Sequence, residues 1–425
     1  MNSVMRRALI TLVAASLSNA APAIAQTGNP NPMDSIRRLP GYRAAYDSIV
    51  FLAPERIAKY APALRGRWED YIARSRDLYA RDTASMKREL RAAGKTEMTR
   101  GPYAHDFSVK PEMTRAWFAT DSARRMALSI LSFQAPNGGW SKHVDFAAHE
   151  RQPGESYFAE SADWEWISTI DNDATTEEIH FLARADSVRH DTRYTSAIAR
   201  AIDYLLAAQY PNGCMPQVYP LQGSYHDAAT FNDNATVNAL RVFQETADGA
   251  YSDAADQRTR AKAALEKGIE CIVDAQVRLG GQLSGWGQQH DPLTFAPTSA
   301  RSYELTSLAA QESAFVVDFL MQQPSPSDRI VRAVYAAAAW LKSLPLSGYT
   351  YIAYELKKQP GAAPLWGRLY ELGTERVIMA NRDGVKLYDW NKLTDRRSGY
   401  AWYTTKPAET IAAFEQWSRS HPQRP

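Results

Sequence analysis

The sequence repeats a helical pattern three times, and each copy ends at a glutamine followed by a glycine-containing turn. The glutamines are Gln134, Gln209 and Gln276. Their spacings, 75 and 67 residues, leave room for two helices in each unit. Repeated helical hairpins bury a shared core by stacking, and a stack that closes on itself gathers its turns at one end. The repeat therefore predicts an all-α fold, an incomplete α/α toroid (α/α barrel), with functional residues in the turns.

The rest of the chain adds an N-terminal layer and a few strands. Residues 34–93 carry a charged helical pattern, so we expect an N-terminal helical layer over 34–110 within a single domain that spans 34–420. Two short segments, Gly348–Ile352 and Arg376–Met379, have the composition of strands.

The first 25 residues are typical of an export signal. An apolar run over residues 8–17 precedes a small-residue cleavage motif at 23–25, and residues 26–33 are expected to form a disordered leader. No run is long enough to span a membrane. We therefore expect an exported protein, periplasmic or secreted. Cys214 and Cys271 can pair in such a compartment, but the sequence does not place them within bridging distance.

The charge of the mature chain excludes one class of partner. Removal of Arg6 and Arg7 with the signal changes the formal net charge from +2 to 0. A neutral chain has no global attraction to nucleic acid, so we expect neither a nucleic-acid nor a membrane partner. No oligomerisation signal is present, and we expect a monomer. An acidic substrate would need local basic groups.

Two oxygen-rich clusters lie in the middle of the chain. Residues 168–178 hold four carboxylates, an amide and several hydroxyls, and residues 231–236 repeat the pattern. Hard cations such as calcium prefer oxygen ligands of this kind. Asp, Asn and Thr also accept hydrogen bonds from free N–H groups at the starts of helices. The clusters indicate either a site for a divalent cation or an anionic sugar, or two helix N-caps.

Further motifs follow in order from residue 126 to residue 403. They are QAPNGGW at 134–140, TIDNDATT at 169–176, QYPNG at 209–213, PQVYP at 216–220, TFNDNA at 230–235, QHDP at 289–292, ARSYEL at 300–305, NRDG at 381–384 and RRSGYAWY at 396–403. This ordered set resembles family 10 of the polysaccharide lyases, the pectate lyases with an α/α-toroid fold. The chain departs from the family pattern at Cys214-Met215 and at Trp286-Gly287, which affects the expected subsites more than the reaction.

The resemblance implies secreted pectate lyase activity, in which β-elimination in polygalacturonate gives 4,5-unsaturated oligogalacturonates. The proton on C5 lies beside a carboxylate, and a cation on that carboxylate offsets the charge that builds up as the proton leaves. By position, Asp171 and Asp233 match the acidic residues of a Ca²⁺ site, and Asp173 is a further candidate ligand. Helix capping by either Asp171 or Asp233 is the alternative.

The same resemblance implies that Arg301 is the Brønsted base. Free arginine has a pKa above about 12, so this role predicts an alkaline optimum and a site that favours the neutral guanidine. The alternative is that Arg301 forms an ion pair with Glu304 or Glu312 on a helix face.

Other side chains are expected to bind the substrate, because arginine binds carboxylates in bidentate fashion and tryptophan rings stack on sugars. The candidates are Arg382, Arg397 and its neighbour Arg396, Lys142, Asn172, Trp140 and Trp286. Solvated cations and core-packed tryptophans are the alternatives. His290 is expected to be a hydrogen-bonded loop residue rather than a base oriented by Asp291.

Two other functions fit the same residues. A glycoside hydrolase on this scaffold would use a carboxylate pair such as Asp171 with Glu177 or Asp233. A non-catalytic uronate-binding protein would keep the aromatic and arginine side chains. The arginine set favours the lyase, because a neutral glycan would not need it.

Overall fold

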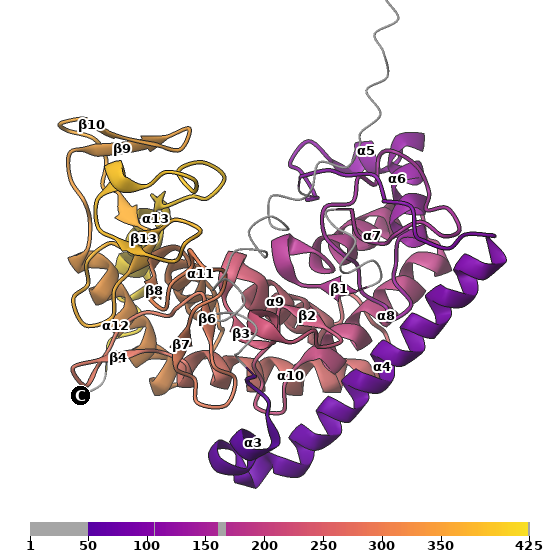
Figure 1. The fold of residues 1–425 in the computed structure, drawn as a ribbon, viewed down its shortest axis with the longest axis horizontal. Helices are drawn as coiled ribbons and strands as arrows, with labels where there is room; N and C mark the ends of the chain where they lie inside the picture. Colours follow the sequence, from indigo (N-terminus) through magenta and orange to yellow (C-terminus); the bar gives the residue numbers. More distant parts are fainter. Residues whose placement is uncertain (1–49, 106, 160–166, 424–425) are drawn as a thin grey trace, which may run out of the picture.

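The computed structural model describes residues 50–105, 107–159 and 167–423 (Figure 1). The expected signal, the leader and the start of the N-terminal layer lie outside these residues. In the described part of the chain, helices alternate between two layers. The first layer contains α6 (Asp121–Ser132), α8 (Thr192–Ala208), α10 (Ala255–Asp274) and α12 (Asp328–Ser343). The second contains α7 (Thr176–Val188), α9 (Ala235–Ala247), α11 (Ala310–Met321) and α13 (Lys406–Trp417).

Successive helices of each layer contact one another, from α6 to α12 in the first layer and from α7 to α13 in the second. This arrangement of stacked hairpins confirms the predicted incomplete α/α toroid. The sequence starts several of the helices with a side-chain cap: Asp191 accepts from Arg193 N at 2.9 Å, and Ser327 accepts from Ile330 N. Alanines such as Ala197 and Ala201 are fully buried, which lets neighbouring helices approach closely.

The repeated glutamines fasten each hairpin to the next one. Each Nε2 donates one hydrogen bond to a carbonyl of its own turn and one to a carbonyl of the following first-layer helix. The pairs of acceptors are Gly138 and Ala197 for Gln134, Gly213 and Ala264 for Gln209, and Ser284 and Ala333 for Gln276, all at 2.7–2.9 Å. The sequence repeat therefore corresponds to a structural repeat in which each glutamine forms the same two hydrogen bonds.

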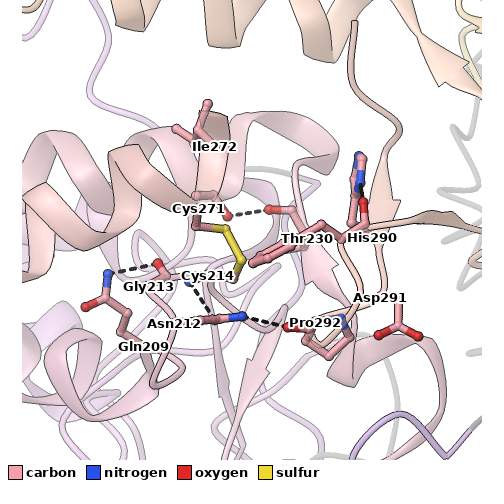
Figure 2. Close-up of a disulfide and its surroundings, with 12 residues drawn as sticks. Gln209, Asn212, Gly213, Cys214, Thr230, Cys271, Ile272, His290, Asp291 and Pro292 are labelled. Carbon is pink, nitrogen blue, oxygen red and sulfur yellow. Dashed lines mark hydrogen bonds between the residues drawn. A yellow bond between two sulfur atoms is a disulfide. The ribbon is translucent and has the colours of Figure 1, made fainter. Parts of the chain in front are cut away.

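A disulfide between Cys214 and Cys271 takes the place of a tight contact found in the other repeats (Figure 2). In the first repeat the equivalent turn residue is Gly139, where an added Cβ would lie 2.8 Å from the Tyr204 ring. In the third it is Gly285, where a Cβ would lie 2.6 Å from Trp340. The turn thus meets the next helix at the same point in all three repeats, and only the second uses a covalent bond.

Loss of this disulfide should lower the free energy of unfolding by about 4 kcal/mol, given the 57-residue separation of the cysteines. The measurement is denaturant unfolding of a Cys214→Ala/Cys271→Ala variant beside the wild type. A Cys214→Gly/Cys271→Tyr variant, which copies the Gly139–Tyr204 pair, should recover part of the loss. Equal stability of the Ala/Ala variant and the wild type would contradict the prediction.

Short antiparallel ladders connect the turns at one end of the helix layers. The pairs are β1 (Ser168–Thr169) with β2 (Val218–Tyr219), β3 (Ala229–Thr230) with β6 (Gln289–His290), β6 with β7 (Pro297–Thr298), β8 (Leu308–Ala309) with β12 (Leu369–Tyr370), β11 (Trp366–Gly367) with β15 (Tyr403–Thr404), and β4 (Arg278–Leu279) with β5 (Gln282–Leu283). These ladders hold neighbouring loops side by side.

The two strands expected from the sequence differ in extent from the observed ones. The segment 348–352 contains β9 (Tyr349–Ile352), which pairs with β10 (Glu355–Lys358). The segment 376–379 is a strand only from Met379, where β13 (Met379–Ala380) begins and pairs with β14 (Lys386–Leu387). Val377 forms an isolated antiparallel bridge with Tyr370 instead.

The N-terminal helices lie along the outside of the toroid (Figure 1). They are α3 (Pro54–Tyr60), the 3-10 turn η1 (Pro62–Leu64), the long α4 (Arg65–Ala92) and the short α5 (Arg115–Phe118). Trp68 and Tyr71 of α4 are fully buried against Tyr210, and the Tyr71 hydroxyl donates to Ala208 O at 2.8 Å. This layer braces the ends of the first-layer helices.

A charged histidine connects α7 with α9. His180 Nδ1 lies 3.1 Å from Glu177 and its Nε2 lies 3.4 Å from Glu245. Burial alone lowers the pKa of His180, but the two carboxylates raise it more, to about 9. The charged His180 ring therefore stabilises the folded state fully below the unfolded pKa of 6.5, and this stabilisation is lost as the pH rises through 9.

We predict that a His180→Gln variant loses up to about 3 kcal/mol of unfolding free energy at pH 6 and little at pH 10. Denaturant unfolding of both proteins at the two pH values measures this difference. A gap between variant and wild type that does not narrow at high pH would show that the imidazolium charge does not contribute.

Candidate active site

Two strained loops precede second-layer helices and carry the predicted oxygen clusters. The 3-10 turn η2 (Asp171–Asp173) leads into α7, and η4 (Asn232–Asn234) leads into α9; the two turns contact each other. In both loops the second and third residues are left-handed, with φ of 51° and 62° in η2 and of 47° and 64° in η4. Such residues cost about 1 kcal/mol or more each, and they cluster at functional sites.

The helix-capping alternative is wrong for both aspartates. Thr175 is the N-cap of α7 and Asn234 is the N-cap of α9, and neither helix has a side-chain cap hydrogen bond. The carboxylates of Asp171 and Asp233 are therefore not used to satisfy helix starts.

The tryptophans expected to stack on sugar serve the core instead, so that assignment is wrong. Trp140 and Trp286 are fully buried. Their Nε1 atoms donate to Ile130 O and Ile272 O, each at 2.7 Å, and their backbone N–H groups donate to hydroxyls at the starts of α7 and α11. Tryptophan here fixes each turn onto the helix before it and the helix after it.

Asp171 lies in the site with a lysine beside it. Lys142 Nζ is 2.6 Å from Asp171 Oδ2 and 3.2 Å from Asn172 Oδ1. Asp171 is only 6% exposed, and its Oδ1 has no hydrogen-bond partner among the described residues. Burial raises the pKa of Asp171, but Lys142 lowers it more, to about 2. The carboxylate is therefore ionised, with one oxygen left to bind another group.

Asp233 lies beside an arginine that the sequence analysis missed. Arg368 Nη2 is 2.9 Å from Asp233 Oδ1 and 2.6 Å from Glu312 Oε1, and its Nε is 3.0 Å from the same Glu312 oxygen. The Asn232 side-chain amide donates to Asp233 Oδ2 at 2.7 Å. The side chains of Arg368 and Glu312 are 7% and 0% exposed. Two carboxylates thus share one buried guanidinium.

Four polar side chains of the site, which include the partners of Asp171 and Asp233, occupy equivalent positions in the repeats. Each lies two residues after Trp140, Met215, Trp286 or Trp366: they are Lys142, Gln217, Gln288 and Arg368. The backbone carbonyls of the last three accept hydrogen bonds from the loop of the preceding repeat, at Ile170 N, Phe231 N and Ala310 N. Gln288 Nε2 also donates to both Asn232 and Glu312 at 2.9 Å. This shared position is the signal by which Gln288 and Arg368 could have been found.

Arg301 forms an ion pair, but in a turn rather than on a helix. Its Nε and Nη2 donate to the two oxygens of Glu304 at 2.7 and 2.6 Å, while Glu312 pairs with Arg368 instead. Nη1 of Arg301 has no hydrogen-bond partner within the described residues, and the side chain is 36% exposed. Burial lowers the pKa of Arg301, but Glu304 raises it more, well above its ordinary value, so the expectation of a site that favours the neutral guanidine is wrong.

Two rings near Arg301 were also missed. Tyr225 and His226, in the 3-10 turn η3 (Ser224–Asp227), have ring centroids 3.8 Å apart. Burial, and then Lys142 and Arg301, lower the pKa of His226 to about 3, with Asp171 opposing. His226 is therefore neutral beside the two cations. No charge pattern in the sequence marked this segment.

The structure separates the two neighbouring arginines near the C-terminus. Arg396 is buried with its guanidinium 4.1 Å from the Tyr303 ring, and burial, Arg382 and Arg301 lower its pKa. Arg397 pairs with Glu355 of β10 at 2.9 Å. Arg382 donates to the Asp395 carbonyl at 3.2 Å. The geometry thus brings Arg396 and Arg382 toward Arg301 and directs Arg397 toward the β9–β10 hairpin.

Three further acidic or basic candidates are engaged in structural bonds. His290 is fully buried, its Nδ1 donates to Phe295 O at 2.8 Å and its Nε2 accepts from Gly287 N at 2.9 Å, which leaves no nitrogen for a base. Glu177 accepts from Val109 N at 2.6 Å and pairs with His180. Asp173 Oδ1 accepts from Asn238 at 2.6 Å.

The donors present fit a hard cation such as calcium. Asp171 Oδ1 is a buried carboxylate oxygen without a hydrogen bond among the described residues, and Asn172 supplies an amide oxygen beside it. Calcium takes six to eight oxygen ligands. Over the described ranges no group of three His, Cys, Asp or Glu side chains converges closely enough to hold an ion by itself. A cation here would need oxygens from a bound acidic ligand.

The chain is similar to known proteins in both its sequence and its fold. The sequence profile described as pectic acid lyase matches residues 134–411. The structure is similar to a family 10 polysaccharide lyase from Cellvibrio cellulosa, with a TM-score of 0.62 and 35% identity over 73% of this chain and 98% of that chain. An aspartate-to-alanine mutant of that enzyme, in complex with trigalacturonic acid, matches with the same score and identity over 73% and 99%. Among curated proteins, none matches.

Proposed function

The chain belongs to the pectic acid lyases, family 10 of the polysaccharide lyases, and on that premise we propose that it cleaves de-esterified polygalacturonate by calcium-assisted β-elimination with Arg301 as the base. The observation that carries the proposal is the ionised Asp171, whose Oδ1 is free of hydrogen bonds to described residues, at the same end of the toroid as Arg301. The trigalacturonic acid complex of the similar enzyme supports the choice of substrate.

Asp171, Asn172 and Asp233 would hold the calcium ion together with a uronate of the substrate. When bound, the ion offsets the charge that builds up on the uronate as the C5 proton leaves. Lys142 lowers the pKa of Asp171 and keeps it ionised at neutral pH, and Arg368 pairs with Asp233. Asp173 remains a predicted ligand, although Asn238 engages one of its oxygens.

Arg301 would take the C5 proton through its Nη1. Glu304 holds the opposite edge of the guanidinium, which fixes its direction. The electron pair of the C5–H bond forms the C4–C5 double bond, the C4–O bond breaks, and solvent protonates the leaving oxygen. Because Glu304 favours the protonated arginine, the neutral base becomes more abundant only as the pH rises. This proposal thus implies an alkaline optimum.

Arg382 and Arg396 would bind neighbouring uronates, with Lys142 binding one further along the chain. Each presents N–H donors suited to a carboxylate. Arg397 remains a candidate at the edge of this surface, where it must exchange Glu355 for the substrate.

Export of the protein is part of the proposal. The disulfide supports an oxidising compartment, and the N-terminal sequence has the pattern of an export signal. Among the residues that the structure describes, none of the helices is long and apolar enough to cross a membrane. A monomeric state stays a prediction.

The test is ultraviolet absorbance of the purified protein with polygalacturonate at alkaline pH, first with calcium and then with a chelator. Calcium-dependent growth of the unsaturated-uronate absorbance is the expected result. New reducing ends without absorbance would indicate a hydrolase, and neither signal would indicate a binding protein.

A further inference from the structure

Beyond Lys142, the rim of the site carries a cluster of rings. We define this rim cluster as Tyr103, His105 and His143. The ring centroids of Tyr103 and His143 are 5.6 Å apart, and those of His105 and His143 are 6.0 Å apart. Tyr103 is 55% exposed. His143 directly follows Lys142, whose Nζ contacts Asp171. The rim cluster therefore begins where the charged part of the site ends.

Backbone pairing holds the rim cluster in place. Tyr103 forms an antiparallel bridge with Val144, Ala104 N donates to His143 O at 3.0 Å, and Asp145 N donates to Pro102 O at 2.8 Å. His143 has a φ of 64°, a left-handed conformation that is uncommon outside glycine. A strained residue that is fixed by paired backbone, directly after the lysine that contacts Asp171, indicates a shaped surface rather than a loose loop.

We propose that the rim cluster binds a further galacturonosyl residue of a long pectate chain, beyond the residues held by Lys142 and Arg301. This inference rests on the proposed function. Tyrosine and imidazole rings offer flat apolar faces that stack on the C–H face of a pyranose.

The cations proposed to bind uronates come from elements on both sides of the molecule. Arg382 follows β13 in the chain, and β13 lies on the opposite side of the molecule from β1 and α7 (Figure 1). Lys142 contacts Asp171 of η2, so a polymer long enough to contact both Arg382 and Lys142 would end beside His143, the residue after Lys142. Tyr103 and His105 precede the family-matched segment 134–411. The N-terminal layer therefore extends the binding surface of the toroid.

The test compares polygalacturonate with trigalacturonate as substrates. For a Tyr103→Ala variant, the ratio of kcat/KM for polygalacturonate to that for trigalacturonate should fall about five- to tenfold, chiefly through KM, since a ring stack contributes about 1 kcal/mol or slightly more. Tyr103→Phe should keep the ratio, because the ring face remains. The matched control is Tyr60→Ala, which removes a 42% exposed tyrosine on the distant α3.

An unchanged ratio in Tyr103→Ala, or the same fall in Tyr60→Ala, would overturn the inference. Failure of the proposed function looks different, because the wild type would then form no unsaturated product from either substrate. In that case affinity electrophoresis in gels that contain polygalacturonate still tests whether the rim cluster binds the polymer. Weaker retardation of Tyr103→Ala than of Tyr60→Ala supports the rim cluster, and equal retardation excludes it.

Discussion

Replacing Arg301 with alanine should lower kcat by about 10²- to 10⁴-fold, the range expected for loss of a proton-transfer group. Oligogalacturonate affinity should change only a few-fold, because Arg382, Arg396 and Lys142 remain to bind uronates. Initial rates of unsaturated product and calorimetric titration with trigalacturonate measure the two quantities. Arg301→Lys, which keeps a positive charge but loses the Glu304-held fork, should be nearly as impaired.

A second variant separates a base from a purely electrostatic arginine. Glu304→Gln keeps an acceptor for Arg301 but removes the negative charge that raises the pKa of that arginine. If Arg301 is the base, its neutral fraction at a given pH increases, so the rising limb of the pH–kcat profile moves to lower pH. If Arg301 acts only as a cation, the limb keeps its position. Near-normal turnover in Arg301→Ala would exclude both roles.

The fold was predictable because the residues that repeat in the sequence form the same hydrogen bonds in each repeat. The glutamine of each unit donates the same two hydrogen bonds, to its own turn and to the next helix, so its spacing reports the spacing of hairpins. The disulfide was not predictable from spacing alone. Only after the turns are superposed does Cys214 fall where Gly139 meets Tyr204.

The site was predictable in part, and the errors have a common cause. Clusters of oxygen atoms in sequence marked η2 and η4, since neighbouring ligands lie on one short loop. Arg368 contacts Asp233 across 135 residues of chain and Glu312 across 56, and no local pattern in the sequence links the three residues. The tryptophans were misassigned because an aromatic beside a glycine turn suits a core and a sugar platform equally well until burial is known.

The second large effect is expected at Asp171. An Asp171→Asn variant keeps the shape of the side chain and an oxygen for Lys142, but it removes the charge that would bind calcium. Loss of one ionic ligand and of the charge stabilisation it supports should cost several kcal/mol, or about 10³-fold in kcat/KM. Half-maximal activity should need far more calcium than in the wild type. Of the two carboxylates that remain as proposed ligands, Asp173 already accepts a hydrogen bond from Asn238, which leaves Asp233.

Calcium binding itself gives the decisive measurement for this residue, since activity alone would also fall if the loop η2 lost its shape. Calorimetric titration of calcium into protein saturated with trigalacturonate should show weaker binding in Asp171→Asn. Asp173→Asn is the matched control, with the same charge change two residues away in the same strained loop and with its Oδ1 facing Asn238. An unaltered calcium affinity in Asp171→Asn would remove Asp171 from the ligand set. A loss of equal size in both variants would instead assign both aspartates to the ion, which would then draw Asp173 away from Asn238.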